Sequence, residues 1–276
     1  MEKIKISSPA KINIGLWITG KRPDGYHDIF TLYHTVDLND YIYIEPYHKL
    51  SVSSTSPKVP ENEENIVYKA LKKFEEWTGI ETNYKILIEK NIPVGAGLGG
   101  GSSNAAAVLK KINELEGSPL SEEELMKLAS TLGADVPFFI KGGFAKAEGI
   151  GDKLTFFENR FKEELFIIYP NIEVSTKEIY SMVTENILTK KEEIPIIDSL
   201  LKDLEAILDN IENTLGELAQ ERYPVVKEVM NTLKYLGYRP NVSGSGSSVY
   251  VFGSPNEEIE RICKVKNWKL IKTTLK

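Results

Sequence analysis

A glycine-rich segment constrains what this chain can fold into more than any other feature, because five of the seven residues from 95 to 101 are glycine. Before it, residues 84–89 alternate apolar and polar side chains, which predicts a β-strand that ends by Pro93. After it, apolar side chains repeat at helical spacing from Ala105 to Gly117. Glycines let backbone N–H groups crowd around a ligand, and a helix start adds unpaired N–H groups and the positive end of the helix dipole. The sequence therefore predicts a cradle for a polyphosphate.

The predicted cradle differs from two common phosphate loops, and a flexible surface loop is the alternative to it. No Lys-Ser or Lys-Thr pair follows the last glycine, as a Walker A motif requires. A Gly-x-Gly-x-x-Gly pattern from Gly95 to Gly100 matches the dinucleotide fingerprint formally, but no strand–helix–strand unit with an acidic residue about 20 positions on is evident. We expect Ser102 and Ser103 to cap the helix and to offer hydroxyl groups to a phosphate or to Mg²⁺. The residues predicted to form the cradle are Pro93, Val94, Gly95, Ala96, Gly97, Leu98, Gly99, Gly100, Gly101, Ser102 and Ser103.

Composition excludes several classes of protein. The 276 residues include 34 Lys and Arg against 40 Asp and Glu, and this net charge of −6 argues against a protein that binds duplex nucleic acid. The single cysteine, Cys263, excludes an intrachain disulfide and a cysteine-cluster metal site. No apolar stretch approaches the roughly 18 uninterrupted residues of a membrane span. We therefore expect a cytoplasmic protein without nucleic-acid or membrane partners. We also expect it to act on a small molecule, as a monomer or weak homodimer.

The remaining pattern predicts a chain of mixed helices and strands. Apolar residues on one face predict a helix over 65–78 that ends at Gly79, and Ser121-Glu122-Glu123-Glu124 is the capping box of another helix. Short apolar or alternating runs predict strands at residues 4–8, 41–44, 138–140, 165–169 and 249–252. Further helices are predicted at roughly 176–184 and 198–220 and from Pro224 to Gly237, and residues 185–197 are the most typical of a mobile linker.

Two charged residues stand among small or apolar neighbours. Lys11 lies in Ser8-Pro9-Ala10-Lys11-Ile12-Asn13, at the end of the first predicted strand. Asp135 lies in Leu132-Gly133-Ala134-Asp135-Val136-Pro137, just after a predicted helix. Spacing alone favours an exposed turn charge or a structural ion pair for both residues.

A resemblance changes that balance. The Pro9–Asn13 segment, the glycine loop, the Leu132–Pro137 segment and Ser243-Gly244-Ser245-Gly246 occur in the order found in the GHMP kinase superfamily. The match spans residues 8 to about 252 and is looser from 155 to 240. Arg22-Pro23-Asp24-Gly25-Tyr26-His27 also resembles a cytidine-binding stretch within that superfamily.

The resemblance implies an ATP- and Mg²⁺-dependent kinase that phosphorylates an alcohol. It implies an α+β fold, with an α/β nucleotide-binding domain over residues 1–158, a ferredoxin-like α+β domain over residues 159–276 and an active site between them. Lys11 and Asp135 would be the catalytic residues that meet at the substrate hydroxyl. The Asp135 carboxylate would accept the hydroxyl proton or orient the hydroxyl. The Lys11 ammonium would keep that carboxylate ionised and would stabilise the alkoxide that develops on the substrate. A kinase of the homoserine or mevalonate type and a non-catalytic nucleotide-binding protein are the alternatives.

The resemblance also implies the residues that bind the two ligands. His27 would contact cytosine, with Tyr33 or Tyr180 as the aromatic platform, although core packing is the ordinary role of a tyrosine. Asn65 is either a helix cap or a contact of the adenine ring. Asn13 would hold substrate hydroxyls or Lys11 itself. The predicted substrate-binding residues are Asn13, Tyr26, His27, Tyr33 and Tyr180.

Overall fold

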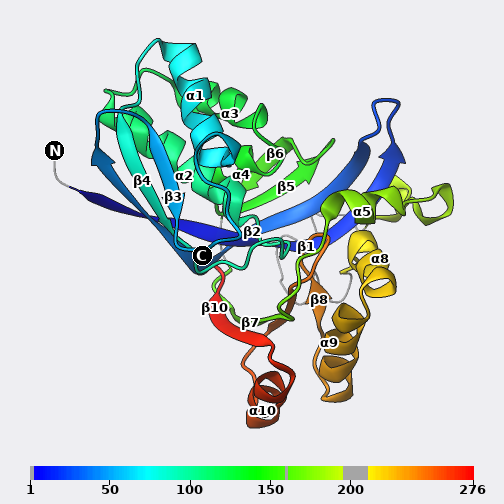
Figure 1. Cartoon of the computed structure of the whole chain (residues 1–276). Coiled ribbons are helices and arrows are strands. Elements are labelled where there is room, and N and C mark those ends of the chain that lie inside the picture. Colours follow the sequence, from blue (N-terminus) through cyan, green and yellow to red (C-terminus); the bar gives the residue numbers. More distant parts are fainter. Residues whose placement is uncertain (1–2, 159–160, 195–210) are drawn as a thin grey trace. The chain divides into compact units, whose positions relative to one another are not determined.

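The computed structural model describes residues 3–158, 161–194 and 211–276 (Figure 1). Its described residues form two compact units, one from residues up to 10, 38–94 and 99–142, and one from 11–37, 95–98 and 143 onward. Two long strands, β1 (Ile4–Lys21) and β2 (His27–Pro46), contribute to both units. The predicted domain boundary between residues 158 and 159 stays a prediction, because each compact unit is assembled from three separate segments of the chain.

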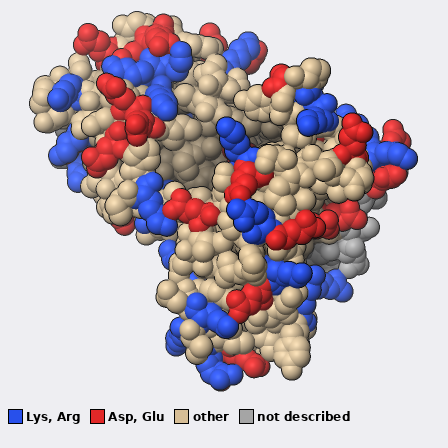
Figure 2. Space-filling model, turned by 45° about the vertical axis from the view of Figure 1, so that its right-hand side comes forward, with Lys and Arg blue, Asp and Glu red and all other residues tan. Residues whose placement is uncertain are grey.

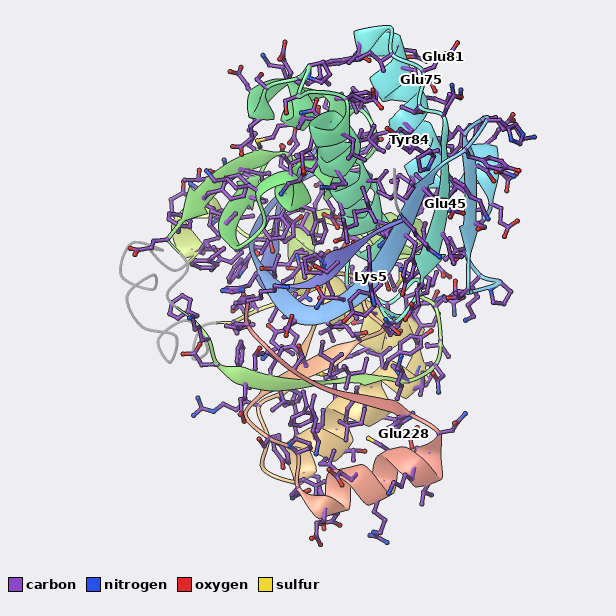
Figure 3. All side chains as sticks on the ribbon, turned by 90° about the vertical axis from the view of Figure 1, so that its left-hand side faces the viewer. Lys5, Glu45, Glu75, Glu81, Tyr84 and Glu228 are labelled. Atoms are coloured by element: carbon purple, nitrogen blue, oxygen red, sulfur yellow. The ribbon has the colours of Figure 1, made fainter. Side chains whose placement is uncertain are left out.

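The sheet of the first unit is built on the second half of β2. This half pairs antiparallel with β4 (Tyr84–Glu89), which runs parallel to β3 (Ser51–Ser54). The predicted alternation in β4 is confirmed, since every second side chain from Tyr84 on is buried. Lys5, labelled in Figure 3, belongs to β1. Its Nζ lies over the ring of Tyr41, 3.9 Å from the ring centroid.

Four α-helices belong to the first unit. Helix α2 contacts α1, α3 and α4. The predicted end of the first helix is confirmed, because Gly79 caps α1 in the left-handed conformation. The predicted capping box is also present, with Ser121 and Glu124 bonded to each other's backbone N–H groups. The helical elements are η1 (Asn62–Glu64), α1 (Ile66–Thr78), α2 (Gly100–Leu115), α3 (Glu122–Ser130) and α4 (Val136–Lys141).

The prediction of a strand at residues 138–140 is wrong. These residues lie inside α4, whose residues from Val136 to Ile140 are all buried. Pro137 is tolerated there because the first N–H groups of a helix have no intrahelical partner. A short apolar run that is buried on every side shows no 3.6-residue period, and it therefore looks like a buried strand.

The second unit contains two sets of strands. The first half of β2 pairs with β5 (Phe144–Glu148), which pairs in turn with β6 (Lys153–Phe157). The other set is an antiparallel sheet in the order β10-β7-β9-β8. The predicted strands at 165–169 and 249–252 are confirmed as parts of this sheet. Its strands are β7 (Glu164–Tyr169), β8 (Asn241–Val242), β9 (Val249–Phe252) and β10 (Lys269–Thr274).

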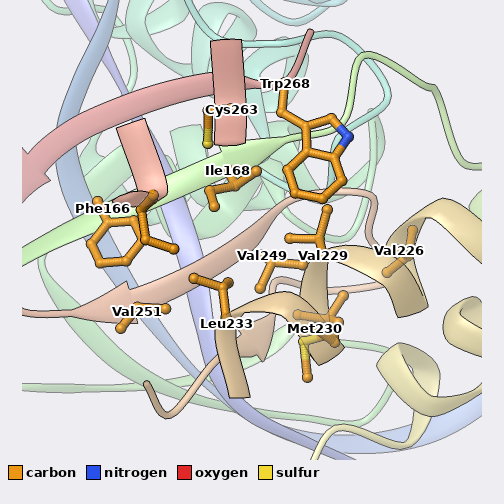
Figure 4. Close-up of a cluster of buried hydrophobic side chains, with 12 residues drawn as sticks. Phe166, Ile168, Val226, Val229, Met230, Leu233, Val249, Val251, Cys263 and Trp268 are labelled. Atoms are coloured by element: carbon orange, nitrogen blue, oxygen red, sulfur yellow. The ribbon is translucent and has the colours of Figure 1, made fainter. Parts of the chain in front are cut away.

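Two helices cover the sheet β10-β7-β9-β8. Helices α9 (Pro224–Tyr235) and α10 (Glu257–Lys266) contribute Leu233 and Cys263 to a core that includes Phe166 of β7 (Figure 4). The predicted helix from Pro224 is confirmed. Such a core gives the sheet a rigid base, because interiors of this kind are close-packed.

A smaller cluster lies beside β1. Leu16 and Ile18 of β1 contact Ile179 of α5 (Thr176–Ser181) and Leu215 of α8 (Thr214–Arg222). The helix predicted at 176–184 is thus present but shorter, and 3₁₀ turns η2 (Glu185–Ile187) and η3 (Lys191–Glu193) follow it. Of the helix predicted at 198–220, the part up to residue 210 lies outside the described residues. None of the helices in the described ranges is long and apolar enough to cross a membrane.

Candidate functional site

The glycine loop leads into α2 through a residue without a side chain. Gly99 is the N-cap of α2, with a left-handed φ of 69°, and no side chain caps the first turn. The prediction that Ser102 and Ser103 cap this helix is therefore wrong, since both lie inside it. A helix start without a capping side chain keeps its first N–H groups available for an anion.

The two serines of α2 have different surroundings. Ser103 is buried, and its Oγ accepts a hydrogen bond of 2.7 Å from Ser8 of β1. Ser102 is only half-buried. Of the two hydroxyl groups, that of Ser102 is therefore the better candidate for a contact with phosphate or Mg²⁺, and both contacts stay predictions.

A buried ion pair holds the entry to the loop. The carboxylate of Asp40 pairs with Lys90, and the two side chains are 0% and 5% exposed. Asp40 also accepts hydrogen bonds from the backbone N–H groups of Asn91 and Ile92 at 2.8 and 2.9 Å. Asn104 of α2 donates a further bond of 2.9 Å. One carboxylate thus fixes both the residues that precede the loop and the helix that follows it.

The middle of the loop, residues 95–98, packs against the second glycine motif. Ser243 donates from its hydroxyl to the carbonyl of Gly97 at 2.9 Å, and the N–H of Ser248 donates to Ala96 at 3.2 Å. A Cβ on Gly97 would lie 2.1 Å from the carbonyl oxygen of Ser243. The contact between the two motifs therefore requires glycine at position 97.

Gly97→Ala should weaken binding of ADP by about tenfold or more. The φ of 76° at Gly97 alone costs a side chain about 1–2 kcal/mol, and the added methyl group would push the two glycine motifs apart. Calorimetric titration with ADP measures the effect. Gly237→Ala is the matched control, because its φ is 83° and nothing lies within 4 Å of an added Cβ. Equal affinity of both variants for ADP would contradict the role given to this contact.

Lys11 lies on β1, and its backbone N–H donates to the carbonyl of Leu98 at 3.0 Å. The side chain is buried, at 4% exposure. Its Nζ donates to Oδ1 of Asn13 at 2.5 Å and lies 5.0 Å from the centroid of the Tyr33 ring. The structure therefore brings three predicted residues together, and it places a buried ammonium on a strand that is bonded to the glycine loop.

Asp135 is the residue before α4. Its backbone is in the right-handed helical region, and its side chain does not cap the helix. The residue is half-buried. Asp135 belongs to the first unit and Lys11 to the second, so the meeting of the two at a substrate hydroxyl stays a prediction.

His27 and Tyr180, both predicted to bind substrate, lie side by side in the second unit. Their rings stack at 5.3 Å between centroids with 25° between the planes. His27 is buried, and its Nε2 has no hydrogen-bond partner among the described residues. Burial, with a smaller effect of Lys21, lowers the pKa of His27 below its usual value. A buried polar atom without a protein partner is uncommon and calls for a partner of another kind, such as water or a ligand atom.

The other two predicted substrate residues differ from this pair. Tyr26 is 60% exposed, whereas Tyr33 is buried against Lys11. Of the two candidate platforms for cytosine, Tyr180 is the one beside His27. Stacking on the base stays a prediction for both.

Comparison with known proteins decides the family. Residues 65–143 match the family described as GHMP kinases N terminal domain. A 4-diphosphocytidyl-2-C-methyl-D-erythritol kinase of Persephonella marina (strain DSM 14350 / EX-H1) is 65% identical to this chain over 271 residues. The match covers 98% of this chain and 99% of the relative. This chain belongs to the 4-diphosphocytidyl-2-C-methyl-D-erythritol kinase family.

Solved structures agree with this assignment. A crystal structure of 4-(cytidine 5'-diphospho)-2C-methyl-D-erythritol kinase is similar with a TM-score of 0.82 and 32% identity, over 99% of both chains. The mevalonate kinase of Methanococcus jannaschii shares the fold, with a TM-score of 0.72 and 17% identity over 100% of this chain and 99% of its own. The predicted α+β GHMP kinase fold and the predicted kinase class are thus confirmed, and ATP use comes with membership of the family.

Asn65 of the kinase has a clear structural role. Its Oδ1 accepts from the N–H of Val67 at 2.8 Å, and its Nδ2 donates to the carbonyl of Pro60 at 2.6 Å. The helix-cap interpretation is therefore confirmed, and the contact with adenine stays a prediction.

Several buried residues that bond to the predicted site residues, or to the segments beside them, could not be recognised from the sequence. Asp40, Lys90 and Asn104 form the ion-pair network, and Thr31 accepts a hydrogen bond of 2.9 Å from Asn13. Local spacing gives no signal for such pairs, because their partners are distant in the sequence. Among the described residues, no cluster of three or more His, Cys, Asp or Glu side chains is arranged to hold a metal ion.

Proposed function

We propose that this kinase transfers the γ-phosphoryl group of ATP to the 2-hydroxyl of 4-diphosphocytidyl-2-C-methyl-D-erythritol. The products are ADP and the 2-phosphate, on the non-mevalonate route to isopentenyl diphosphate. The 65% identical relative carries the name of this substrate. The observation in this chain that carries the cytidine part is the buried Nε2 of His27, which has no hydrogen-bond partner within residues 3–158, 161–194 and 211–276 and lies beside the ring of Tyr180.

We infer that His27 recognises the edge of cytosine. A neutral imidazole offers one N–H donor and one acceptor, and the cytosine edge offers their complements. The lowered pKa of His27 keeps the ring neutral at pH 7. The stacked ring of Tyr180 fixes the imidazole plane and so the direction of its hydrogen bonds.

We infer that the triphosphate of ATP binds at the glycine loop. The uncapped first turn of α2 and the positive end of its dipole stabilise negative charge. Mg²⁺, bound with ATP, would neutralise phosphate charge during transfer. The hydroxyl of Ser102 is an oxygen ligand of the kind that this ion takes.

The substrate hydroxyl is assigned to Lys11 and Asp135. An alcohol becomes a good nucleophile when its proton is accepted as the bond to phosphorus forms, and the Asp135 carboxylate can accept it. The ammonium of Lys11 stabilises the developing alkoxide. The hydrogen bond from Lys11 Nζ to Oδ1 of Asn13, at 2.5 Å, gives this ammonium a buried acceptor.

Turnover with purified substrates tests the proposal. The protein, ATP, Mg²⁺ and 4-diphosphocytidyl-2-C-methyl-D-erythritol should give ADP, measured with a coupled assay. Faster turnover of homoserine or mevalonate than of 4-diphosphocytidyl-2-C-methyl-D-erythritol would favour a kinase of the homoserine or mevalonate type. Inhibition by CDP in competition with the alcohol substrate would argue against both of these alternatives. A folded protein that binds ATP but turns over none of these alcohols would be the non-catalytic alternative.

Affinity for 4-diphosphocytidyl-2-C-methyl-D-erythritol should be constant from pH 8 to pH 7 and should fall at lower pH. Burial lowers the pKa of His27 below its usual value of 6.5, so the ring stays neutral until the pH falls below that value. Protonation at lower pH then removes the acceptor. Calorimetric titration without ATP measures this, because the diphosphate diester of the substrate does not titrate in this range. His27→Phe keeps an aromatic ring, and it should bind about tenfold more weakly with no dependence on pH. The same pH dependence in His27→Phe would exclude His27 as its source.

We also propose a cytoplasmic monomer or weak homodimer without nucleic-acid partners. The net charge of −6 supports the absence of nucleic-acid partners. On the face drawn in Figure 2, Lys and Arg alternate with Asp and Glu and form no continuous basic stripe.

A further inference from the structure

Thr31 of β2 lies behind Asn13, on the side away from Lys11. It is fully buried, at 0% exposure. Its hydroxyl oxygen lies 2.9 Å from Nδ2 of Asn13 and 2.6 Å from the carbonyl oxygen of Gly15. The neighbours Asn13 and Gly15 are both on β1, so one hydroxyl group links two positions of the adjacent strand.

The direction of these hydrogen bonds follows from the number of protons available. A threonine hydroxyl has a single hydrogen, and the carbonyl of Gly15 can only accept. The hydrogen of Thr31 therefore points at Gly15, and toward Asn13 the hydroxyl can only accept. Asn13 must then turn its NH₂ group to Thr31 and its oxygen to Lys11.

The opposite orientation of the Asn13 amide is doubly unfavourable. It would place the amide oxygen against the lone pairs of Thr31 and the NH₂ group against the ammonium of Lys11, which carries only donors. Both contacts are buried, where an unpaired polar group costs most. Thr31 thus distinguishes two orientations of the amide that have nearly the same shape.

The backbone of Asn13 is held independently of Thr31. The hydroxyl of Tyr250, a fully buried residue, donates to the Asn13 carbonyl at 2.9 Å. The N–H of Asn13 lies 3.4 Å from Oγ of Ser243 in the second glycine motif. The orientation of the side-chain amide is therefore what Thr31 adds.

We propose that Thr31 is a positioning residue that turns the Asn13 oxygen toward Lys11 and thereby holds the Lys11 ammonium in place for phosphoryl transfer. This inference depends on the proposed role of Lys11. Without the Thr31 hydroxyl, the two orientations of the Asn13 amide differ less in energy. The amide oxygen would then face the Lys11 ammonium for only part of the time.

Steady-state kinetics of Thr31 variants tests the proposal. Thr31→Val keeps the shape of the side chain and removes the hydroxyl, and it should lower kcat about tenfold with the KM for ATP changed less than about twofold. Thr31→Ser keeps the hydroxyl and should restore kcat to within about threefold of the parent. Thr35→Val is the matched control on the same strand, because Thr35 is also buried and donates its hydroxyl to a backbone carbonyl, that of Lys276.

Asn13→Ala separates positioning from packing. If Thr31 acts through Asn13, Thr31→Val should cost less than about twofold in kcat when it is added to Asn13→Ala. If Thr31→Val is too unstable to assay, Thr31→Ala takes its place in both backgrounds. An unchanged kcat in Thr31→Val, an equal loss in Thr31→Ser, or a full additional loss on Asn13→Ala would overturn the proposal. Lys11→Met tests the role of Lys11 separately from that of Thr31. An active Lys11→Met enzyme would contradict the proposed role of Lys11 itself.

Discussion

Replacing Asp135 by asparagine should lower the rate of phosphoryl transfer by about 10²–10⁴-fold and leave the affinity for ADP within about twofold. The change keeps the shape of the side chain and removes the charge that accepts a proton. The start of α4 should be unaffected, because the Asp135 side chain does not cap this helix. Single-turnover phosphoryl transfer and calorimetric binding of ADP measure the two quantities separately.

The size of the loss at position 135 distinguishes the two proposed roles. An asparagine still orients a hydroxyl through a hydrogen bond, so a loss below about tenfold would favour an orienting role over a base. Asp152→Asn is the control, because this residue is exposed and accepts a hydrogen bond from the N–H of Ile150 in a turn. Equal losses of turnover and of ADP binding in Asp135→Asn would instead indicate a structural residue.

The features that the sequence predicted well are local ones. The glycine loop between β4 and α2 follows from the composition of seven residues and from the two patterns on either side. The end of α1 at Gly79 and the capping box at Ser121 follow from single residues with one common conformational use. Such signals depend on neighbours in the sequence, which are known before the fold is.

The features that the sequence did not predict depend on partners far along the chain. Asp40 and Lys90 are 50 residues apart, and neither stands in a motif. Ser103 looked like a helix cap because it follows a glycine run, but its hydroxyl is taken by Ser8, 95 residues earlier. The link from Thr31 to Lys11 through Asn13 appears only when β1 and β2 are paired.

The stacked pair of His27 and Tyr180 illustrates both cases. His27 stands in a motif, and its role was predicted from that motif. Tyr180 is one of 13 tyrosines and had no local signal of its own. Only the fold of the second unit, with the first residue of β2 beside α5, makes Tyr180 the neighbour of His27.

Replacing Asp40 by alanine should lower the free energy of unfolding by about 3–5 kcal/mol, measured by urea denaturation. The change leaves the buried ammonium of Lys90 without its carboxylate, and it removes the acceptor for the N–H groups of Asn91 and Ile92. An uncompensated buried charge of this kind is among the most destabilising single changes in a protein. The double variant Asp40→Leu with Lys90→Met should recover the part of the loss that comes from the unpaired ammonium, because it removes both charges together. The part that comes from the N–H groups of Asn91 and Ile92 should remain, since leucine offers them no acceptor.

Glu45 provides the matched control for Asp40, since it lies on the same strand and pairs with Lys85 of β4 at 3.0 Å (Figure 3). The Glu45 and Lys85 side chains are 37% and 50% exposed, so water screens the pair. Glu45→Ala should therefore cost less than about 1 kcal/mol. Asp40→Ala should in addition weaken ADP binding, because Asp40 holds both sides of the glycine loop through Ile92 and Asn104. An Asp40→Ala variant as stable as Glu45→Ala would mean that Lys90 finds water or another partner, and the buried pair would then not be what fixes the glycine loop.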